Sequence, residues 1–222
     1  MINTTNKFKT ANEAFEYFYP ILSRFGDDFS NTRCLFNVGF EITNPLQNEI
    51  HTSYRNWSIK YAKREWAWYL SGNPNAEEIA RFAPIWQKMM DSDGNVRSNY
   101  GWQWEREHQL DKVVAILRDN PDSRQASISI YDGKEISTYR NDTPCTYAIH
   151  FYIHEDKLNM SVMMRSNDIW YGFCNDQYCF SELQKIVSER VSVDVGTYYH
   201  FVNNLHVYDN FIGRDYNPTT II

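Results

Sequence analysis

The sequence has no long hydrophobic run. None of its apolar stretches approaches the roughly 20 residues that a membrane-spanning helix needs. The first residues, Met-Ile-Asn-Thr-Thr-Asn-Lys, also lack the charged-then-apolar order of a signal peptide. We therefore expect a cytoplasmic protein that does not bind membranes.

Cysteine is scarce as well, with four residues in a chain of 222 and no CxxC pair among them. In a cytoplasmic protein these cysteines are expected to be reduced thiols. The histidines His150 and His154 have no partners at metal-ligand spacing. The sequence therefore predicts neither a disulfide framework nor a metal site.

Basic residues are in deficit. The chain has 22 Lys and Arg against 28 Asp and Glu, which gives a formal net charge of -6. Proteins that bind nucleic acid usually carry a basic excess, so direct binding of nucleic acid is not expected. A small phosphorylated ligand remains possible, because it needs only two or three well-placed arginines.

Aromatic residues, in contrast, are abundant at 16% of the chain, which excludes intrinsic disorder. No repeat, low-complexity segment or Gly/Ser-rich linker divides the sequence, so we expect one domain over residues 1–222. Hydrophobic spacing predicts helices first and then mostly strands, which favours an α+β fold with a mixed or antiparallel sheet. The predicted helices cover 11–24, 53–70, 76–90 (interrupted by Pro84), 107–118 and 176–190; the predicted strands cover 127–131, 147–153, 158–164 and 197–208.

Cys145 and Arg165 are the first candidate pair for chemistry. Cys145 precedes one predicted strand, and Arg165 follows the next strand along the chain. If the two strands form a hairpin, the guanidinium lies near the thiol and favours its ionised form. The alternatives are a buried structural cysteine and a surface ion pair between Arg165 and Asp168.

Several segments carry a resemblance to a known family. Together, in their order and spacing over residues 50–210, they resemble the thymidylate synthase family, and within it most of all the phage deoxycytidylate hydroxymethylase branch. The segments are Arg-Glu-Trp-Ala-Trp-Tyr-Leu-Ser-Gly around Glu65, Ser-Asn-Tyr-Gly-Trp-Gln-Trp at 98–104, Asn-Pro-Asp-Ser-Arg at 120–124, Asn-Asp-Thr-Pro-Cys-Thr at 141–146, Arg-Ser-Asn-Asp at 165–168, Gly-Phe-Cys-Asn-Asp at 172–176 and His-Val-Tyr at 206–208.

The resemblance implies a thymidylate synthase-like fold, with helices on one side of the sheet and the other face used for homodimerisation. It also implies a catalytic mechanism in which the Cys145 thiolate attacks C6 of a pyrimidine nucleotide and thereby activates C5. The one-carbon donor would be 5,10-methylenetetrahydrofolate. Glu65 would relay protons, and Tyr100 would position the base and the thiol. Both residues have a plain structural alternative, as a solvated helix residue and a core aromatic respectively.

The resemblance further implies the ligands of the two substrates. Arg165 and Ser166 would bind the nucleotide phosphate, and Arg124 would cross the dimer to reach the phosphate site of the partner. The remaining assignments are His206 and Tyr208 for the sugar 3′-hydroxyl, and Trp86, Asp168 and Gly172 for the folate.

Asp176 is the position that indicates which base is bound. Thymidylate synthases carry Asn here, whose amide matches the N3–H and O4 of uracil. A carboxylate suits the N4 amino group of cytosine, provided that it shares a proton with N3. The resemblance and Asp176 together imply a phage-type dCMP 5-hydroxymethyltransferase, which would work in the host cytoplasm if a phage encodes it. The alternative for Asp176 is a helix-capping residue.

Two departures from the family pattern concern binding and catalysis. Thr146 replaces the usual histidine after the nucleophile, and Gln125 replaces a second phosphate arginine, for which Arg24 or Arg33 is a candidate substitute. The alternative functions are thymidylate synthase itself, a C5-methylase or hydroxymethylase of dCMP or CMP, and a relative that binds nucleotide without catalysis.

Overall fold

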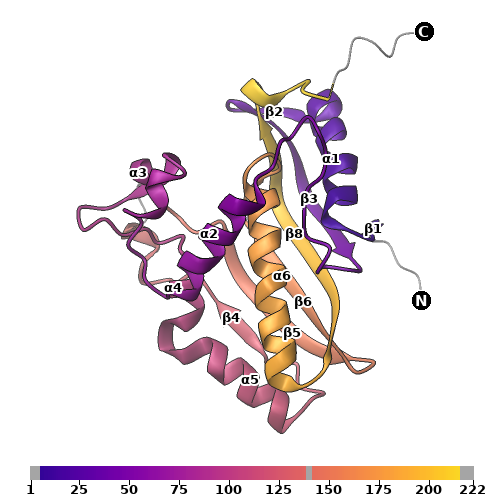
Figure 1. Ribbon diagram of the computed structural model, residues 1–222, viewed down its shortest axis with the longest axis vertical. Coiled ribbons are helices and arrows are strands. Elements are labelled where there is room, and N and C mark those ends of the chain that lie inside the picture. The colour runs from indigo at the N-terminus through magenta and orange to yellow at the C-terminus, as the bar shows by residue number, and fades with distance from the viewer. Residues whose placement is uncertain (1–5, 139–141, 216–222) are drawn as a thin grey trace.

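The computed structural model describes residues 6–138 and 142–215. Its eight-stranded sheet has the order β1-β3-β8-β6-β5-β4, with β2 beside β3 and β7 beside β8 (Figure 1). Three pairings, β1–β3, β6–β8 and β7–β8, are parallel and the others antiparallel, which confirms the predicted mixed sheet. The strands are β1 (Asn6–Phe8), β2 (Asp27–Phe29), β3 (Thr32–Ile42), β4 (Ser127–Ser129), β5 (Thr146–His154), β6 (Lys157–Met164), β7 (Asn167–Asp168) and β8 (Asp194–Tyr208).

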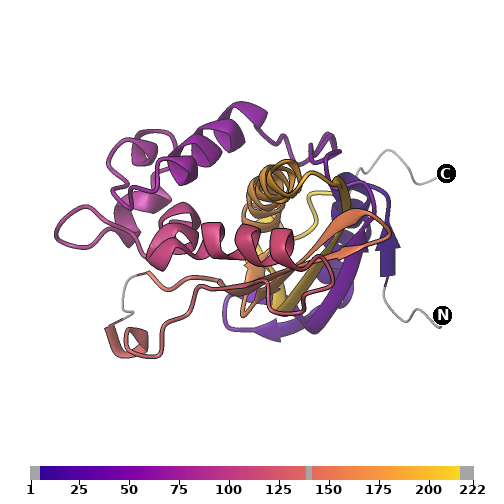
Figure 2. The same cartoon turned by 90° about the horizontal axis from the view of Figure 1, so that it is seen from below.

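The helices gather on one side of this sheet, as Figure 2 shows for α2, α5 and α6. The longest, α6, crosses the sheet and buries Phe173, Phe180 and Val187 completely. Burying such side chains contributes about 1.5–3 kcal/mol each. The helices are α1 (Ala11–Phe25), α2 (Ile59–Leu70), α3 (Ile85–Met89), α4 (Tyr100–Glu105), α5 (Gln109–Asp119) and α6 (Gly172–Val191), with short 3-10 turns at Ile79–Arg81, Arg106–His108, Ile136–Thr138 and Asp209–Phe211.

The hairpin of β5 and β6 forms where the sequence predicted it. Glu155 and Asp156 make its two-residue turn, and both have positive φ angles, 52° and 56°. This is the conformation that a type I′ turn requires, and its twist matches that of the flanking strands. The pairing continues to Thr146 and Met164 at the far end, so it fixes where the residues just beyond the strands lie.

Two predicted helices are shorter than expected. The helix expected over 53–70 begins only at Ile59, because Asn56 takes a φ of 47° and the Ser58 side chain caps the first turn. The interruption expected at Pro84 within 76–90 is confirmed, but the helical pieces on either side are only a 3-10 turn and the five-residue α3. Proline cannot supply the backbone N–H that a helix interior needs.

The ends of other elements also differ by a few residues. The helix expected from residue 107 begins at Gln109, because Glu107 and His108 are left-handed, with φ of 54° and 55°. The strand expected over 127–131 ends at Ser129, and α6 begins at Gly172 rather than at residue 176.

A long strand in the first quarter of the chain was missed. The eleven residues of β3 pair with β8 from Thr32↔Tyr208 to Ile42↔Tyr198. The expected order of helices followed by strands is therefore wrong in this region. Because β3 lies against the C-terminal half of β8, it forms the sheet on which His206 and Tyr208 are placed.

The helices within 6–138 and 142–215 include none with the length and apolar character that crossing a membrane requires. Over the same ranges, no three His, Cys, Asp or Glu side chains are arranged to hold a metal ion.

Candidate active site

Cys145 and Arg165 meet at the open end of the β5–β6 hairpin. The backbone N–H of Arg165 donates to the carbonyl of Cys145 at 2.8 Å, and Arg165 Nη2 lies 3.7 Å from the Cys145 Sγ. The predicted proximity of the thiol and the guanidinium is thus confirmed. The side chain of Cys145 is only partly buried, whereas Cys34, Cys174 and Cys179 are fully buried.

The surroundings of Cys145 nevertheless disfavour its thiolate. Burial raises the pKa of the thiol to about 11, and the carboxyl groups of Asp176, Asp142 and Asp168 raise it further, against the opposing effect of Arg165. Arg165 lowers the pKa of the thiol, as expected, but burial raises it by more. In the ligand-free protein at neutral pH, the thiol is protonated.

Alkylation of Cys145 by iodoacetamide is therefore expected to be slow at pH 7. Because only the thiolate reacts, the rate should rise about tenfold per pH unit up to roughly pH 10, approaching a plateau near the pKa of about 11. Intact-protein mass spectrometry follows the reaction, with Cys145→Ala as the control for labelling of the other cysteines. A plateau already at pH 8.5 would show that burial does not govern this thiol.

Arg165 is held in place by the loop before Cys145. Its Nε donates to the carbonyl of Pro144 at 3.1 Å, and its Nη2 donates to that of Thr143 at 2.8 Å. These bonds leave Nη1 available for an anion. Ser166 follows, and among the described residues neither its hydroxyl nor the exposed guanidinium of Arg124 has a hydrogen-bond partner.

Glu65 is almost fully buried, with 3% of its surface exposed, on the inner face of α2. It accepts a hydrogen bond from the Tyr69 hydroxyl at 2.9 Å, and Tyr61 also bonds to it. Burial raises the pKa of Glu65 despite these two bonds, which excludes the alternative of a solvated helix residue. A carboxyl with a raised pKa suits proton transfer near neutral pH.

Tyr61 is a site residue that the sequence analysis missed. Its hydroxyl also accepts a hydrogen bond from Trp86 Nε1 at 2.9 Å, so it links Trp86 to Glu65. The signal was available, because Tyr61 and Tyr69 lie four residues before and after Glu65 and so share its face of the helix.

Tyr100 contacts the residue that follows the cysteine. Its hydroxyl accepts a hydrogen bond from the backbone N–H of Thr146 at 3.3 Å, and its ring packs 5.1 Å from that of Phe180. Tyr100 is therefore placed to hold the start of β5, and with it Cys145, against α6.

Asp176 lies in the first turns of α6 and is 9% exposed. Asn167 Nδ2 donates to its Oδ2 at 2.7 Å. Burial raises the pKa of Asp176 well above its usual value, and the nearby charges of Glu65 and Asp168 add to this. Because α6 begins at Gly172, Asp176 is inside the helix, and the alternative of a capping residue is wrong.

His206 and Tyr208 stand at the end of β8. The two rings lie edge to face at 5.2 Å, and Tyr208 is half-exposed. Asp168 in β7 pairs with His206 in the sheet. The carboxylate of Asp168 accepts backbone hydrogen bonds from Trp170 at 3.1 Å and Tyr171 at 2.8 Å.

The residues expected at the folate lie in two places. Asp168 and Gly172 are beside Asp176, whereas Trp86 packs on Trp68 with ring centroids 5.1 Å apart and reaches Glu65 only through Tyr61. They fit a folate chemically, because the oxygens of Asp168 keep lone pairs for the N–H donors of a pterin and the indole offers a flat apolar face.

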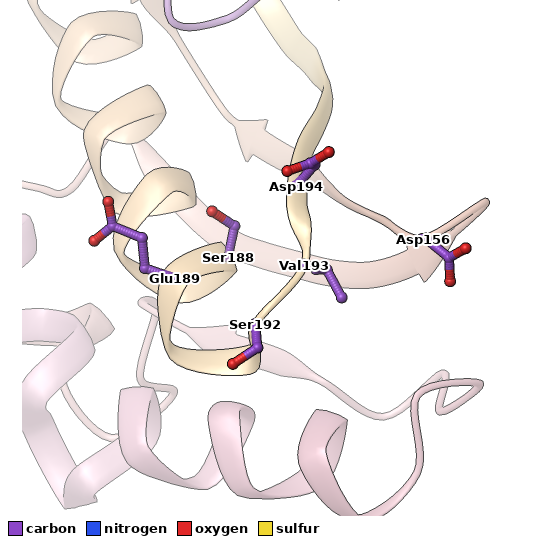
Figure 3. Close-up of a pocket in the computed structure, with 6 residues that line it drawn as sticks. All are labelled: Asp156, Ser188, Glu189, Ser192, Val193 and Asp194. Atoms are coloured by element: carbon purple, nitrogen blue, oxygen red, sulfur yellow. The ribbon is translucent and has the colours of Figure 1, made fainter.

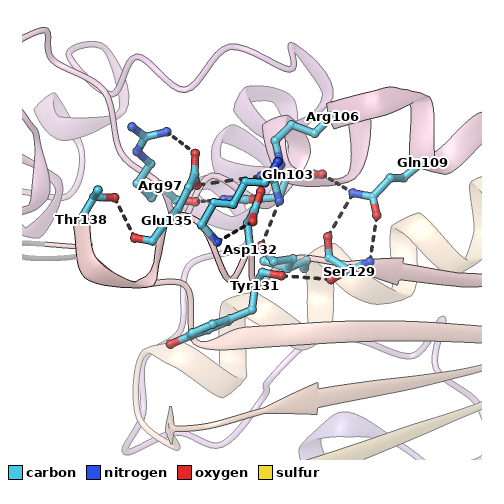
Figure 4. Close-up of polar contacts among 11 residues, drawn as sticks. Arg97, Gln103, Arg106, Gln109, Ser129, Tyr131, Asp132, Glu135 and Thr138 are labelled. Carbon is cyan, nitrogen blue, oxygen red and sulfur yellow. Dashed lines mark hydrogen bonds and ion pairs between the residues drawn. The ribbon is translucent and has the colours of Figure 1, made fainter.

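A polar network, also missed from the sequence, anchors the segment that leads toward Cys145. In Figure 4, Glu135 lies between Arg97, at 3.4 Å, and Arg106, at 3.9 Å. Arg106 also pairs with Asp132 at 3.5 Å and donates to the carbonyl of Ile130. These contacts tie residues 130–135 to the ends of α4.

A separate hollow opens at the far end of α6 (Figure 3). From Asp176 to Ser188 the helix rises about 18 Å, so this hollow does not belong to the site around Cys145. Its lining has three carboxyl groups and two serine hydroxyls but no basic side chain. Its lining residues are Asp156, Ser188, Glu189, Ser192, Val193 and Asp194.

Comparisons with known proteins identify the family to which this chain belongs. A family model described as thymidylate synthase matches residues 26–215. The fold resembles that of the thermostable thymidylate synthase A from Bacillus subtilis, with a TM-score of 0.72, 17% identity and coverage of 93% of this chain and 84% of the other. Fold and family match define a folate-dependent one-carbon transferase, for which 5,10-methylenetetrahydrofolate is the one-carbon donor. The chain belongs to the thymidylate synthase family.

Curated relatives within this family differ in the base that their names state. The deoxycytidylate 5-hydroxymethyltransferase of Enterobacteria phage T4 is 36% identical over 166 residues, 67% of each chain. The deoxyuridylate hydroxymethyltransferase of Pseudomonas phage M6 is 31% identical over 176 residues, 77% of this chain and 50% of that protein. A thymidylate synthase from Bacillus mojavensis is 26% identical over 165 residues, 70% of this chain and 59% of that protein.

Proposed function

We propose that the protein is a deoxycytidylate 5-hydroxymethyltransferase. One observation carries the choice of base, namely the buried carboxyl group of Asp176 with its raised pKa. Its burial and the nearby carboxyl groups favour the protonated form, which has one donor and one acceptor. Cytosine presents an acceptor at N3 and a donor at N4, and a neutral carboxylic acid whose proton faces N3 complements both.

Cys145 supplies the nucleophile in this proposal. Its sulfur forms a bond to C6 of dCMP, and C5 thereby gains the electron density to attack the one-carbon unit. Since the thiol is protonated in the ligand-free protein, its proton must leave as the substrate binds. Arg165, 3.7 Å from the sulfur, favours that loss.

The folate supplies the methylene carbon when it is bound. Glu65, whose pKa is raised by burial, takes part in removing the C5 proton and in adding water to the exocyclic carbon. Overall, dCMP, methylenetetrahydrofolate and water give 5-hydroxymethyl-dCMP and tetrahydrofolate, and Cys145 is regenerated. Trp86, Asp168 and Gly172 are the proposed folate ligands.

The nucleotide phosphate is assigned to Arg165 and Ser166, whose free donors face no protein partner among the described residues. The candidate substitutes for the arginine missing at Gln125 are both engaged elsewhere. Arg24 pairs with Asp215 at 2.7 Å and Arg33 with Asp28 at 3.5 Å. His206 and Tyr208 are the proposed ligands of the sugar 3′-hydroxyl.

A homodimer completes the proposed phosphate site. The exposed Arg124 would reach the phosphate of the partner chain. The sheet face that the helices leave open is the proposed interface, since β8 alternates buried residues with the partly exposed aromatics Tyr199 and Phe201. Aromatic side chains are enriched at subunit interfaces.

The product formed from cytosine and uracil nucleotides tests this function. The protein is incubated with methylenetetrahydrofolate and either dCMP, CMP or dUMP, and the products are identified by mass spectrometry. We expect 5-hydroxymethyl-dCMP to be the main product. A methylated product with dihydrofolate formation would identify a methylase, turnover of dUMP alone would overturn the choice of base, and nucleotide binding without any product would support a non-catalytic relative.

A further inference from the structure

Within residues 6–138 and 142–215, one side chain forms a hydrogen bond to the carboxyl group of Asp176. Asn167 lies in β7 with 2% of its surface exposed, and its Nδ2 donates to Asp176 Oδ2 at 2.7 Å. The amide oxygen of Asn167 is buried and has no hydrogen-bond partner among the described residues. Leaving a buried acceptor unpaired is costly, so this amide orientation is retained for its bond to the carboxyl group.

Gly172 leaves the room for this contact. A Cβ at position 172 would lie 2.8 Å from Asn167 Nδ2 and 3.4 Å from Asp176 Oδ2. The first distance is too short for any side chain, so even alanine would displace the Asn167 amide. The glycine at the start of α6 therefore preserves the bond between strand β7 and the acid on the helix.

A protonated aspartate by itself does not select cytosine over uracil. With the proton on the oxygen that faces N3, the group matches cytosine. With the proton on the oxygen that faces position 4, the same group donates to O4 of uracil and accepts from N3–H. Selection therefore requires control over which of the two oxygens carries the proton.

We propose that Asn167 is the specificity-determining positioning residue, because it keeps the proton of Asp176 off Oδ2. Oδ2 then faces position 4 of the base and accepts from the N4 amino group, while Oδ1 carries the proton to N3. This inference rests on the proposed function.

The preference for a proton on Oδ1 arises from the difference between the two oxygens of a carboxylic acid. The carbonyl oxygen of a carboxylic acid is a better acceptor than its hydroxyl oxygen, so a donor fixed at Oδ2 favours the form protonated at Oδ1. The charges facing Asp176 are Glu65 on α2 and Asp168 on β7, and both favour the protonated form of the group. Asn167 is the neighbour that distinguishes the two oxygens.

Replacing Asn167 by leucine removes the donor and keeps the size of the side chain. We expect the ratio of kcat/KM for dCMP to that for dUMP to fall about tenfold, as loss of a hydrogen bond to an acidic group implies. Asn175→Leu is the matched control. Asn175 is a buried neighbour of Asp176 in the chain, but it bonds to Trp57 and Tyr171, so its loss should leave the ratio unchanged.

A double-mutant cycle separates this effect from general disruption. In an Asp176→Asn background there is no proton to place, and the Asn167 amide can rotate to serve either orientation of the new amide. Asn167→Leu should then change the ratio less than about threefold. If Asn167→Leu does not fold, Asn167→Ser and Gly172→Ala provide the same comparison.

The outcomes distinguish this inference from the proposed function. If the parent protein prefers dUMP, the proposed function itself is wrong. If the parent prefers dCMP and Asn167→Leu leaves the ratio within twofold, or lowers it equally in both backgrounds, Asn167 does not determine specificity. If Asn167→Leu lowers the ratio of kcat/KM for dCMP to that for dUMP only in the protein that retains Asp176, the result supports the proposal.

Discussion

Replacing Cys145 by alanine is expected to lower kcat by at least about 10⁴-fold. Covalent addition at C6 is the step that makes C5 reactive, and no other side chain can substitute for the sulfur. The other three cysteines are fully buried, so none of them reaches a substrate. Turnover of dCMP with methylenetetrahydrofolate is the measurement.

Binding separates the loss of a nucleophile from the loss of the site. Because Arg165 is anchored by the carbonyls of Thr143 and Pro144 rather than by the thiol, Cys145→Ala should still bind dCMP, with a Kd within about tenfold of the parent. Cys34→Ala is the control for removing a buried thiol, and it should keep most of the activity. Substantial turnover by Cys145→Ala would contradict the covalent mechanism.

The parts of the site that the sequence predicted are those governed by local pattern. Alternating residues and a two-residue turn define the β5–β6 hairpin, and the hairpin alone brings Arg165 to Cys145. Helical spacing likewise predicts the faces of α1 and α6. In each case the signal lies within about 20 residues of the sequence.

The parts that escaped prediction depend on contacts between distant segments or on broken patterns. In β3 the alternation of buried residues is interrupted in the middle of the strand, where Phe36 is half-exposed and Asn37 takes a left-handed φ of 56°, although the pairing with β8 keeps a single register. The hydrogen bond between Asn167 and Asp176 joins a strand to a helix, and no periodic pattern in the sequence indicates such a contact.

The pKa of Cys145 is another property that the sequence did not predict correctly. The sequence places Arg165 near it and so indicates a lowered pKa. It does not show how deeply the loop is packed, nor that Asp142, Asp168 and Asp176 converge on the thiol. Desolvation is a property of the whole surrounding fold, and here it outweighs the one charge that the local pattern identifies.

Asp176→Asn is expected to shift the preference from dCMP toward dUMP by about 10³-fold in the ratio of kcat/KM values. The amide that replaces the carboxyl can donate to O4 and accept from N3–H of uracil. One such bidentate contact discriminates between bases by about 1–3 kcal/mol, and the exchange both removes a match to cytosine and adds one to uracil.

The surroundings of Asp176 allow this exchange without rebuilding. Asn167 can rotate its amide so that its unpaired Oδ1 accepts from the new side chain, which satisfies a buried oxygen that has no partner in the described part of the parent protein. The variant also removes an ionisable group beside Glu65, so it should fold at least as stably as the parent. Thermal unfolding checks that point.

Asp142→Asn is the matched control for this switch. Asp142 is also buried and also acts on Cys145, but its carboxylate accepts a hydrogen bond from the backbone of Ser98 at 2.6 Å rather than facing the base. Its replacement should reduce activity or stability and leave the choice of base unchanged. If both variants change the ratio alike, the effect arises from charge near the thiol. If neither variant changes the ratio, Asp176 does not contact the base, and the assignment of a cytosine substrate is no longer supported.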